Sequence, residues 1–464
     1  MCFWVLSAWV LPLALLGLLA KLLLWGNSYI TKLLPQRWQE EGGRGEEEDD
    51  KDVFIPVWKD FHGGCQLICK SSALANCLLR VFQRFLDLEK GSWFWRRWPH
   101  VQTLLQYMLP ANGELEFARD HLQLLDGGIV ALDWVVGPWK TVKSKGGAGT
   151  FNSVPVLLVI PNLLGWLSRN VQQLCLLALE QGFYPVIFSR RGQNGCPLTT
   201  LKLQQFGDPA DLKEAVTYIK FRHPSSLLFA VSEGTGSGSL LSYLGECGSS
   251  SYLTAAGCLS PVFRCQECFE VGLPWLYEWS FLLYQKMSLS RYTTALEDAV
   301  EMKKVFESRS LRELVETLFC LTRKNSTSWN VYWEKNDPLR DVDEVAIPVL
   351  CICSADDPLR GPPQTTLPTE LFKTNPYFFL LLTQHGGHCG FLNNGPISWS
   401  HEVTLEYFRA VTEFLRTEEK INRFPQRRSS VMLHRRRRGT LQKHEPSPSY
   451  DMQEMFSWKR SYTR

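Results

Sequence analysis

Three polar positions, far apart in the sequence, could together carry out nucleophilic acyl transfer. Ser232 lies in A-V-S-E-G, Asp357 in S-A-D-D-P-L, and His388 in H-G-G-H-C-G-F. A serine nucleophile needs an imidazole that takes its proton and a carboxylate that orients the imidazole. One hypothesis is therefore a serine hydrolase with Ser232 as nucleophile, His388 as base and Asp357 as the orienting acid. Asp356 is the alternative acid.

The sequence around Ser232 does not decide which residue, if any, is the nucleophile. Residues 226–245 read S-L-L-F-A-V-S-E-G-T-G-S-G-S-L-L-S-Y-L-G, which predicts a strand, a tight turn and a helix. In α/β-hydrolases this junction is the G-x-S-x-G nucleophile elbow, and here Ala230 replaces its first glycine. Counting back from Y-L-G places Gly234 at the serine position, and glycine has no nucleophilic atom. Glu233 adds a charge of the wrong sign for stabilising an oxyanion.

Backbone donors for an oxyanion are expected after the first buried strand and after the elbow. P-N-L-L-G, residues 161–165, follows the apolar run V-P-V-L-L-V-I-P. The amides of Leu163 and of Thr235 would then be the donors. Asn162 stands where a glycine would allow closer approach, which is a departure from a working site.

The elements that must position these residues alternate between strands and helices. Such alternation predicts an α/β fold with a mostly parallel sheet covered on both faces, whose site lies at the carboxyl ends of the strands. An antiparallel hairpin is expected over residues 122–136, and a helical lid insertion over 265–345. The strands are expected at 154–161, 184–188, 227–231, 253–261, 347–353 and 377–383, and the helices at 171–179, 208–221 and 400–417.

The ends of the chain differ from this middle. The apolar run 3–25 is long enough to cross a bilayer, so residues 1–26 are predicted to be a signal anchor of the secretory membrane system, with a cleaved signal peptide and secretion as the alternative. Residues 27–121 are expected to form a linker and an N-terminal helical region, with helical spacing over 67–88. The hydrolase domain is placed at 122–418, and 419–464 is a basic tail predicted to be disordered.

Composition narrows the class of protein. The 464-residue chain has a net charge of +3, and its central part gives no reason to expect nucleic-acid binding. C-Q-E-C at Cys265 and Cys268 is the only C-x-x-C, and no second pair follows it, so no metal site is predicted. The proposed hydrolysis needs no cofactor. Asn325 begins an N-glycosylation sequon, which has meaning only if this segment faces a lumen or the exterior.

The motifs resemble those of the ABHD one-to-three subfamily of α/β-hydrolases. P-N-L-L-G, R-R-G, S-L-L-S-Y-L-G, A-D-D-P and H-G-G-H-x-G-F occur in the same order over residues 122–415. The resemblance implies the hydrolase fold, an N-terminal membrane anchor, Asp357 and His388 as charge-relay residues, and a setting in lipid metabolism. It does not supply the nucleophile, because the matching position is Gly234.

Two functions follow from this resemblance and remain open. One is a catalytically weak or inactive protein that binds a lipid, an ester or a regulatory protein partner and regulates lipid turnover such as lipolysis. The other is an active lipid esterase that uses Ser232, His388 and Asp357.

Overall fold

The structure is a computed structural model that describes residues 57–61, 65–86, 98–108, 115–136, 154–165, 167–324, 326–392 and 398–432. These residues belong to one compact unit that begins at Ile55. The predicted anchor, the acidic linker, Asn325 and most of the basic tail lie outside the described residues. None of the helices within the described ranges is both long enough and apolar enough to span a bilayer.

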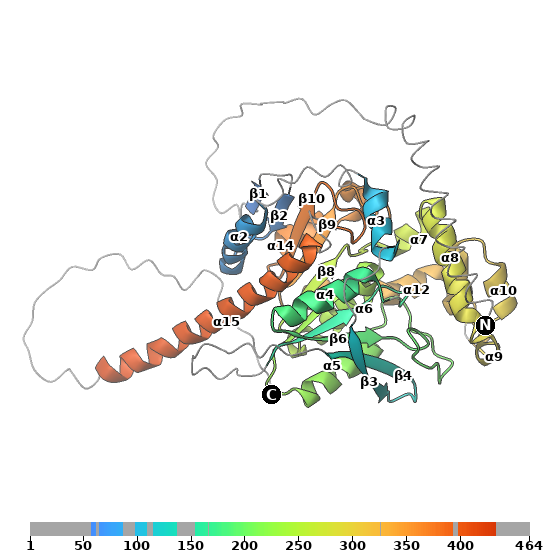
Figure 1. Ribbon diagram of the computed structural model, residues 1–464, viewed down its shortest axis with the longest axis horizontal. Coiled ribbons are helices and arrows are strands. Elements are labelled where there is room, and N and C mark those ends of the chain that lie inside the picture. Colours follow the sequence, from blue (N-terminus) through green and yellow to red (C-terminus); the bar gives the residue numbers. More distant parts are fainter. Residues whose placement is uncertain are drawn as a thin grey trace, which may run out of the picture. The chain divides into compact units, whose positions relative to one another are not determined.

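Ten strands of the described residues form a single sheet, in the order β1-β2-β10-β9-β8-β7-β5-β6-β4-β3 (Figure 1). The six strands from β10 to β6 in this order are parallel to their neighbours, whereas both edges are antiparallel. The strands are β1 Val57–Phe61, β2 Cys65–Cys69, β3 Glu116–Gln123, β4 Ile129–Val136, β5 Val156–Ile160, β6 Tyr184–Ser189, β7 Leu228–Glu233, β8 Ala255–Leu259, β9 Val349–Ser354 and β10 Phe378–Thr383.

Helices cover both faces of the sheet because its central strands are apolar on both faces. In β5, Leu157 and Val159 pack in one hydrophobic core, and Leu158 and Ile160 pack in the other. The first core includes α2 Ala73–Leu86, α4 Arg169–Glu180 and α15 Trp399–Met432. The second includes α5 Ala210–Arg222, α6 Ser237–Cys247 and α14 Thr369–Thr374. The predicted doubly covered sheet is therefore present.

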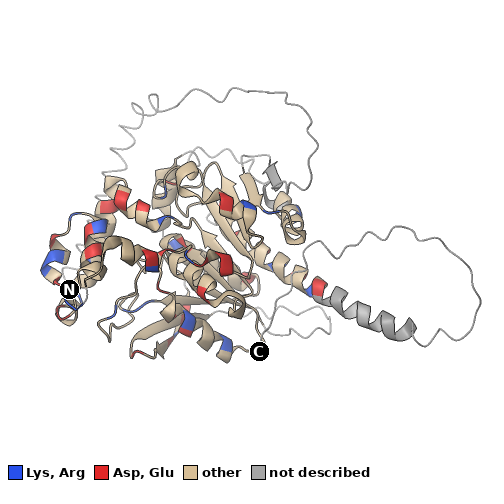
Figure 2. Cartoon of the chain, turned by 180° about the vertical axis from the view of Figure 1, so that it is seen from behind, with Lys and Arg blue, Asp and Glu red and all other residues tan. Residues whose placement is uncertain are grey.

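A helical segment separates β8 from β9 and forms most of two smaller hydrophobic clusters, one of which also includes Phe206 from the loop after β6. Acidic and basic residues are interspersed along its helices (Figure 2). Its elements are α7 Cys265–Val271, α8 Trp275–Ser290, α9 Thr293–Leu296, α10 Met302–Glu307, α11 Leu311–Val315, η4 Glu316–Cys320, α12 Trp329–Asn336 and η5 Val342–Glu344. The remaining short elements of the described chain are α3 Pro99–Met108, η2 Gly234–Gly236, η3 Gly248–Ser250 and α13 Pro363–Thr366.

The structure differs from the sequence prediction at three places. Helical spacing was expected from residue 67, but β2 occupies Cys65–Cys69 and pairs with β10, so the sheet begins well before residue 122. The hairpin expected at 122–136 is present, with its first strand starting at Glu116. Helix α15 continues to Met432, beyond the predicted end at 417. Strand β2 is only five residues long, too short for its alternation to outweigh the helical pattern that follows it.

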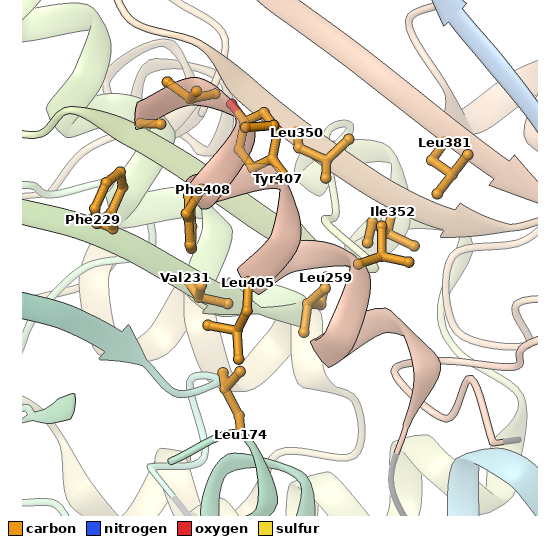
Figure 3. Close-up of a cluster of buried hydrophobic side chains, with 14 of the residues drawn as sticks. Leu174, Phe229, Val231, Leu259, Leu350, Ile352, Leu381, Leu405, Tyr407 and Phe408 are labelled. Atoms are coloured by element: carbon orange, nitrogen blue, oxygen red, sulfur yellow. The ribbon is translucent and has the colours of Figure 1, made fainter. Parts of the chain in front are cut away.

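The core under α15 is expected to be sensitive to truncation of Phe408. This side chain is fully buried, and its ring centroid lies 4.8 Å from that of Phe229 in β7 (Figure 3). We expect Phe408→Ala to lower the free energy of unfolding by about 3–5 kcal/mol, because it leaves a cavity between helix and sheet. Chemical denaturation measures this loss. Glu406→Ala on the same helix is the control and should change stability by no more than about 0.5 kcal/mol.

Candidate functional site

The turn between β7 and α6 brings Gly234 against His388. Strand β7 ends at Glu233, and η2 begins at Gly234. Gly234 has a φ of +49°, in the left-handed region that residues with side chains rarely adopt. A Cβ added to Gly234 would lie 2.8 Å from Nε2 of His388. Position 234 is thus the place from which a nucleophilic side chain would meet the imidazole, and glycine supplies no hydroxyl there.

Ser232 lies inside β7 and not in the turn. It is the register partner of Ile160 in β5 and of Cys258 in β8. Side chains alternate along a strand, so Ser232 faces the same side of the sheet as Ala230, toward the core that contains α5 and α6. Its side chain is fully buried, and its Oγ has no hydrogen-bond partner in the part of the chain that the structure describes.

The structure therefore does not support the hypothesis in which Ser232 is the nucleophile. That hypothesis assumed that the strand ends at Val231 and that Ser232 begins the turn. Strand β7 continues to Glu233, which carries Ser232 into the sheet. The count from Y-L-G, which favours Gly234, agrees with the observed turn.

His388 and Asp357 form a buried hydrogen-bonded pair beyond the ends of β10 and β9. Nδ1 of His388 lies 2.9 Å from Oδ2 and 3.2 Å from Oδ1 of Asp357. Burial opposes the charged imidazole, but the charge and hydrogen bond of Asp357, together with Cys389, outweigh burial and place the pKa of His388 well above its ordinary value. Burial likewise opposes the charged carboxylate, but the charge and hydrogen bond of His388 and the contribution of Arg360 together outweigh it, so the pKa of Asp357 is lowered. The two groups therefore favour an ion pair.

Asp356, the alternative acid, stabilises the loop after β10. Its Oδ1 accepts hydrogen bonds from the backbone N–H groups of Gly386 and Gly387, at 3.0 and 2.9 Å. Its Oδ2 lies 3.4 Å from Nδ1 of His385. Of the two adjacent carboxylates, Asp357 is thus the one that contacts His388.

Side chains of helix α3 form hydrogen bonds with both the backbone N–H and the backbone carbonyl of His388. The N–H of His388 donates to Oγ1 of Thr103 at 2.9 Å, and Nε2 of Gln106 donates to the carbonyl oxygen of His388 at 2.8 Å. A Cβ added to Gly387 would lie 2.5 Å from the carbonyl oxygen of Pro99, so the glycine permits this close packing. Sequence reasoning missed Thr103 and Gln106. Their only signal is a three-residue spacing that places two polar groups on one helix face.

The two predicted oxyanion donors lie next to each other. The N–H of Leu163 donates to Oγ1 of Thr235 at 2.9 Å, and Thr235 directly follows Gly234. The amide that was expected to stabilise an oxyanion is therefore already engaged by a threonine hydroxyl. An oxyanion would have to displace this hydroxyl, which weakens the electrostatic stabilisation on which acyl transfer depends.

Glu233 places a carboxyl group beside the turn, on the opposite face of the sheet from Ser232. It is buried, and Oε2 accepts a hydrogen bond from Oγ of Ser168 at 3.3 Å. Oε1 has no partner among the described residues. Burial raises the pKa of Glu233 to about 7, even though the Ser168 hydrogen bond and the charge of His388 lower it. This carboxyl is consequently only partly ionised at neutral pH.

An apolar cavity of about 210 Å³ opens onto His388 and Thr235. One wall comes from the loop after β5 and from the turn at Gly234, and the other comes from the helical segment between β8 and β9. Arg190 and Glu278 are among its polar lining groups. A mostly apolar cavity whose wall also carries polar groups suits an acyl chain with a polar head. Its apolar lining includes Leu163, Leu164, Phe206, Val262, Phe269, Leu273, Phe281, Leu289, Leu314, Leu318 and Phe319.

Comparisons with known proteins show which proteins this chain resembles. No family model matches the chain. The chain is 59% identical over 461 residues to the human (Homo sapiens) protein ABHD15, and the alignment covers 97% of each chain. It is 28% identical over 317 residues to the phospholipase ABHD3 of Mus musculus, covering 67% of this chain and 74% of that protein. An esterase from Pyrococcus furiosus of known structure aligns at a TM-score of 0.39 with 13% identity, over 65% of this chain and 95% of that one.

Replacing Glu233 with glutamine is expected to increase stability at pH 8 and to change it little at pH 5. The pKa of Glu233 is raised from 4.5 to about 7 in the folded protein. The contribution of the neutral Glu233 carboxyl to the free energy of unfolding is therefore fully present below pH 4.5. It is lost as the pH rises through 7, because the carboxyl then ionises in a buried site. Such a difference in pKa corresponds to about 3 kcal/mol. Unfolding measured at both pH values gives the effect.

Glu267→Gln is the control for this pH dependence, because Glu267 is exposed and paired with Arg264. It should leave the difference between pH 5 and pH 8 unchanged. An equal gain of stability from Glu233→Gln at both pH values would contradict the assignment.

Proposed function

Because the chain belongs to the ABHD family of α/β-hydrolases, we propose that it is a lipid-binding protein that keeps the hydrolase fold without serine esterase chemistry. One observation carries the proposal: Gly234 occupies the position facing Nε2 of His388, and it has no side chain. Without a hydroxyl at this point, His388 has no serine to deprotonate.

The surroundings of the turn support the same conclusion. The N–H of Leu163, the donor that an oxyanion would require, already donates a hydrogen bond to Oγ1 of Thr235. The cavity beside His388 is apolar over most of its wall and accepts a lipid or an ester as ligand. In this proposal the site still binds an acyl chain in its apolar cavity. It lacks two things that cleavage requires, a nucleophilic hydroxyl and a free oxyanion amide.

The proposed role is regulation of lipid metabolism, such as lipolysis, through the bound ligand or through a regulatory protein partner. A relative named as a phospholipase supports the link to lipids. The helical segment between β8 and β9 acts in this proposal as a lid over the cavity that it lines. The apolar run 3–25 anchors the protein in a membrane of the secretory system, and secretion after cleavage is the alternative.

The second candidate is an active serine hydrolase, and the retained pair of His388 and Asp357 is the observation in its favour. It needs a serine that reaches the imidazole. Ser232 faces the interior of the sheet, so this candidate requires a rearrangement of the end of β7. An error of about an ångström at a nucleophile already costs on the order of a hundredfold in rate.

Labelling with a fluorophosphonate probe distinguishes the two functions. We expect no labelling of the wild-type chain and none of Ser232→Ala. Gly234→Ser is expected to gain slow labelling, since it restores a hydroxyl beside His388, and Gly234→Ser with His388→Ala should lose that gain. The gain should be small, because the new Cβ crowds the imidazole and Thr235 still occupies the amide of Leu163.

Adding Thr235→Gly to Gly234→Ser releases that amide and should accelerate labelling by roughly 10²–10³-fold, the usual effect of one oxyanion donor. Labelling of the wild type that disappears in Ser232→Ala would instead establish the active hydrolase.

A further inference from the structure

Arg190 carries a buried positive charge with no carboxylate partner in the part of the chain that the structure describes. It directly follows β6 and is 4% exposed. Its Nη1 donates to the carbonyl oxygen of Asn162 at 3.2 Å and its Nη2 to Oγ of Ser239 at 3.4 Å, while Nε has no partner among the described residues. Burial lowers its pKa to about 10, although the charge of Asp211 raises it, so the guanidinium is still charged at neutral pH. Asp211 is itself paired with Arg191, and a buried cation without an ion pair of its own is costly.

The other cationic groups that line the same cavity already have carboxylate partners. Arg191 binds Asp211 at 2.6 Å, and it also binds a second carboxylate at the tip of the β3–β4 hairpin. His388 is paired with Asp357, and Glu278 accepts a backbone hydrogen bond at the start of α11. Among the cationic groups of the described cavity wall, Arg190 is therefore the one without a carboxylate hydrogen bond.

Contacts connect Arg190 with the turn at Gly234. Arg190 binds the carbonyl of Asn162, and the N–H of the next residue, Leu163, binds Thr235, which follows Gly234. Arg190 also contacts Ser239 in the first turn of α6. Neither η2 nor α6 has a capping side-chain hydrogen bond at its N-terminal end. The N–H of Ser237 at the start of α6 already bonds to the carbonyl oxygens of Gly234 and Thr235, so it is the dipole of α6 that adds positive potential near Arg190.

We infer that this end of the cavity binds the anionic head group of a single-chain lipid, with Arg190 as its counter-ion and the apolar wall around its chain. The inference rests on the proposed lipid-binding function and names the ligand class. The planar guanidinium matches two oxygens of a carboxylate or of a phosphate monoester, so a fatty acid and a lysophosphatidate share the required chemistry. Glycine at position 234 leaves space beside His388 that a serine would fill.

Binding of three ligands with the same sixteen-carbon chain tests the inference on the full-length protein. The ligands are hexadecanoate, hexadecanoyl lysophosphatidate and hexadecanol, which differ only in the head. Isothermal calorimetry below the aggregation limit gives Kd, and the thermal shift of the protein gives an independent reading. We expect the wild type to bind at least one anion roughly 10-fold or more tightly than the alcohol, and the tighter anion identifies the head group.

Variants of Arg190 separate recognition of the head from binding of the chain. Arg190→Met should weaken binding of the anion roughly 10- to 100-fold, as expected for a lost charge-assisted hydrogen bond, and should leave hexadecanol binding unchanged. Arg190→Lys keeps the charge and should lose less. Arg264→Met removes an exposed positive charge at the start of α7, outside the cavity wall, and should have no effect on either ligand.

The outcomes distinguish failure of the inference from failure of the proposed function. Equal wild-type affinity for the anions and the alcohol would overturn the anionic site while keeping a lipid-binding cavity. Absence of binding by all three ligands would overturn both. Arg190→Met could also lose hexadecanol binding and have a lower melting temperature, and Arg190→Lys is then the deciding variant. A folded lysine variant that still binds the anion more tightly than the alcohol supports the inference. A folded lysine variant with equal affinity for both ligands overturns it.

Discussion

The site depends on the buried pair of His388 and Asp357. Two buried charges are stable only when each has its partner and its remaining hydrogen bonds. Asp357 obtains these from the backbone N–H groups of Leu359 and Arg360, in addition to the imidazole. His388 is held through its main chain by α3. The imidazole is therefore fixed in one position, whether or not a nucleophile faces it.

The contact between His388 and Gly234 determines what this fixed imidazole can do. In a serine hydrolase the elbow presents a hydroxyl to the base. Here the turn keeps its left-handed backbone, but the side chain is absent and the neighbouring Thr235 hydroxyl bonds to Leu163. The same rigid framework that would position a reaction thus borders a mostly apolar cavity. Binding needs this framework, whereas cleavage also needs the missing hydroxyl.

The sheet makes this arrangement possible because its parallel strands deliver their ends to one edge. β5, β7, β9 and β10 lead respectively to the loop at Leu163, the turn at Gly234, Asp357 and His388. Two hydrophobic cores, one on each face, hold the strands in register. The segment between β8 and β9 forms most of two small clusters and closes the cavity from the other side. The cavity is therefore lined both by loops of the sheet and by the helical segment that packs against Phe206.

The sequence by itself determined the parallel sheet with its helical layers, because apolar runs and helical spacing are local patterns. It also placed Asp357 and His388 after their strands and left two positions open for the serine. Only the tertiary structure decided between Ser232 and Gly234, since a strand that ends at Glu233 and not at Val231 keeps Ser232 inside the sheet and places Gly234 in the turn. The hydrogen bonds from α3 to His388 and the lack of a carboxylate hydrogen bond to Arg190 could likewise not be predicted from the sequence. Both arise from contacts between residues far apart in the chain, and such contacts leave no periodic pattern in a single sequence.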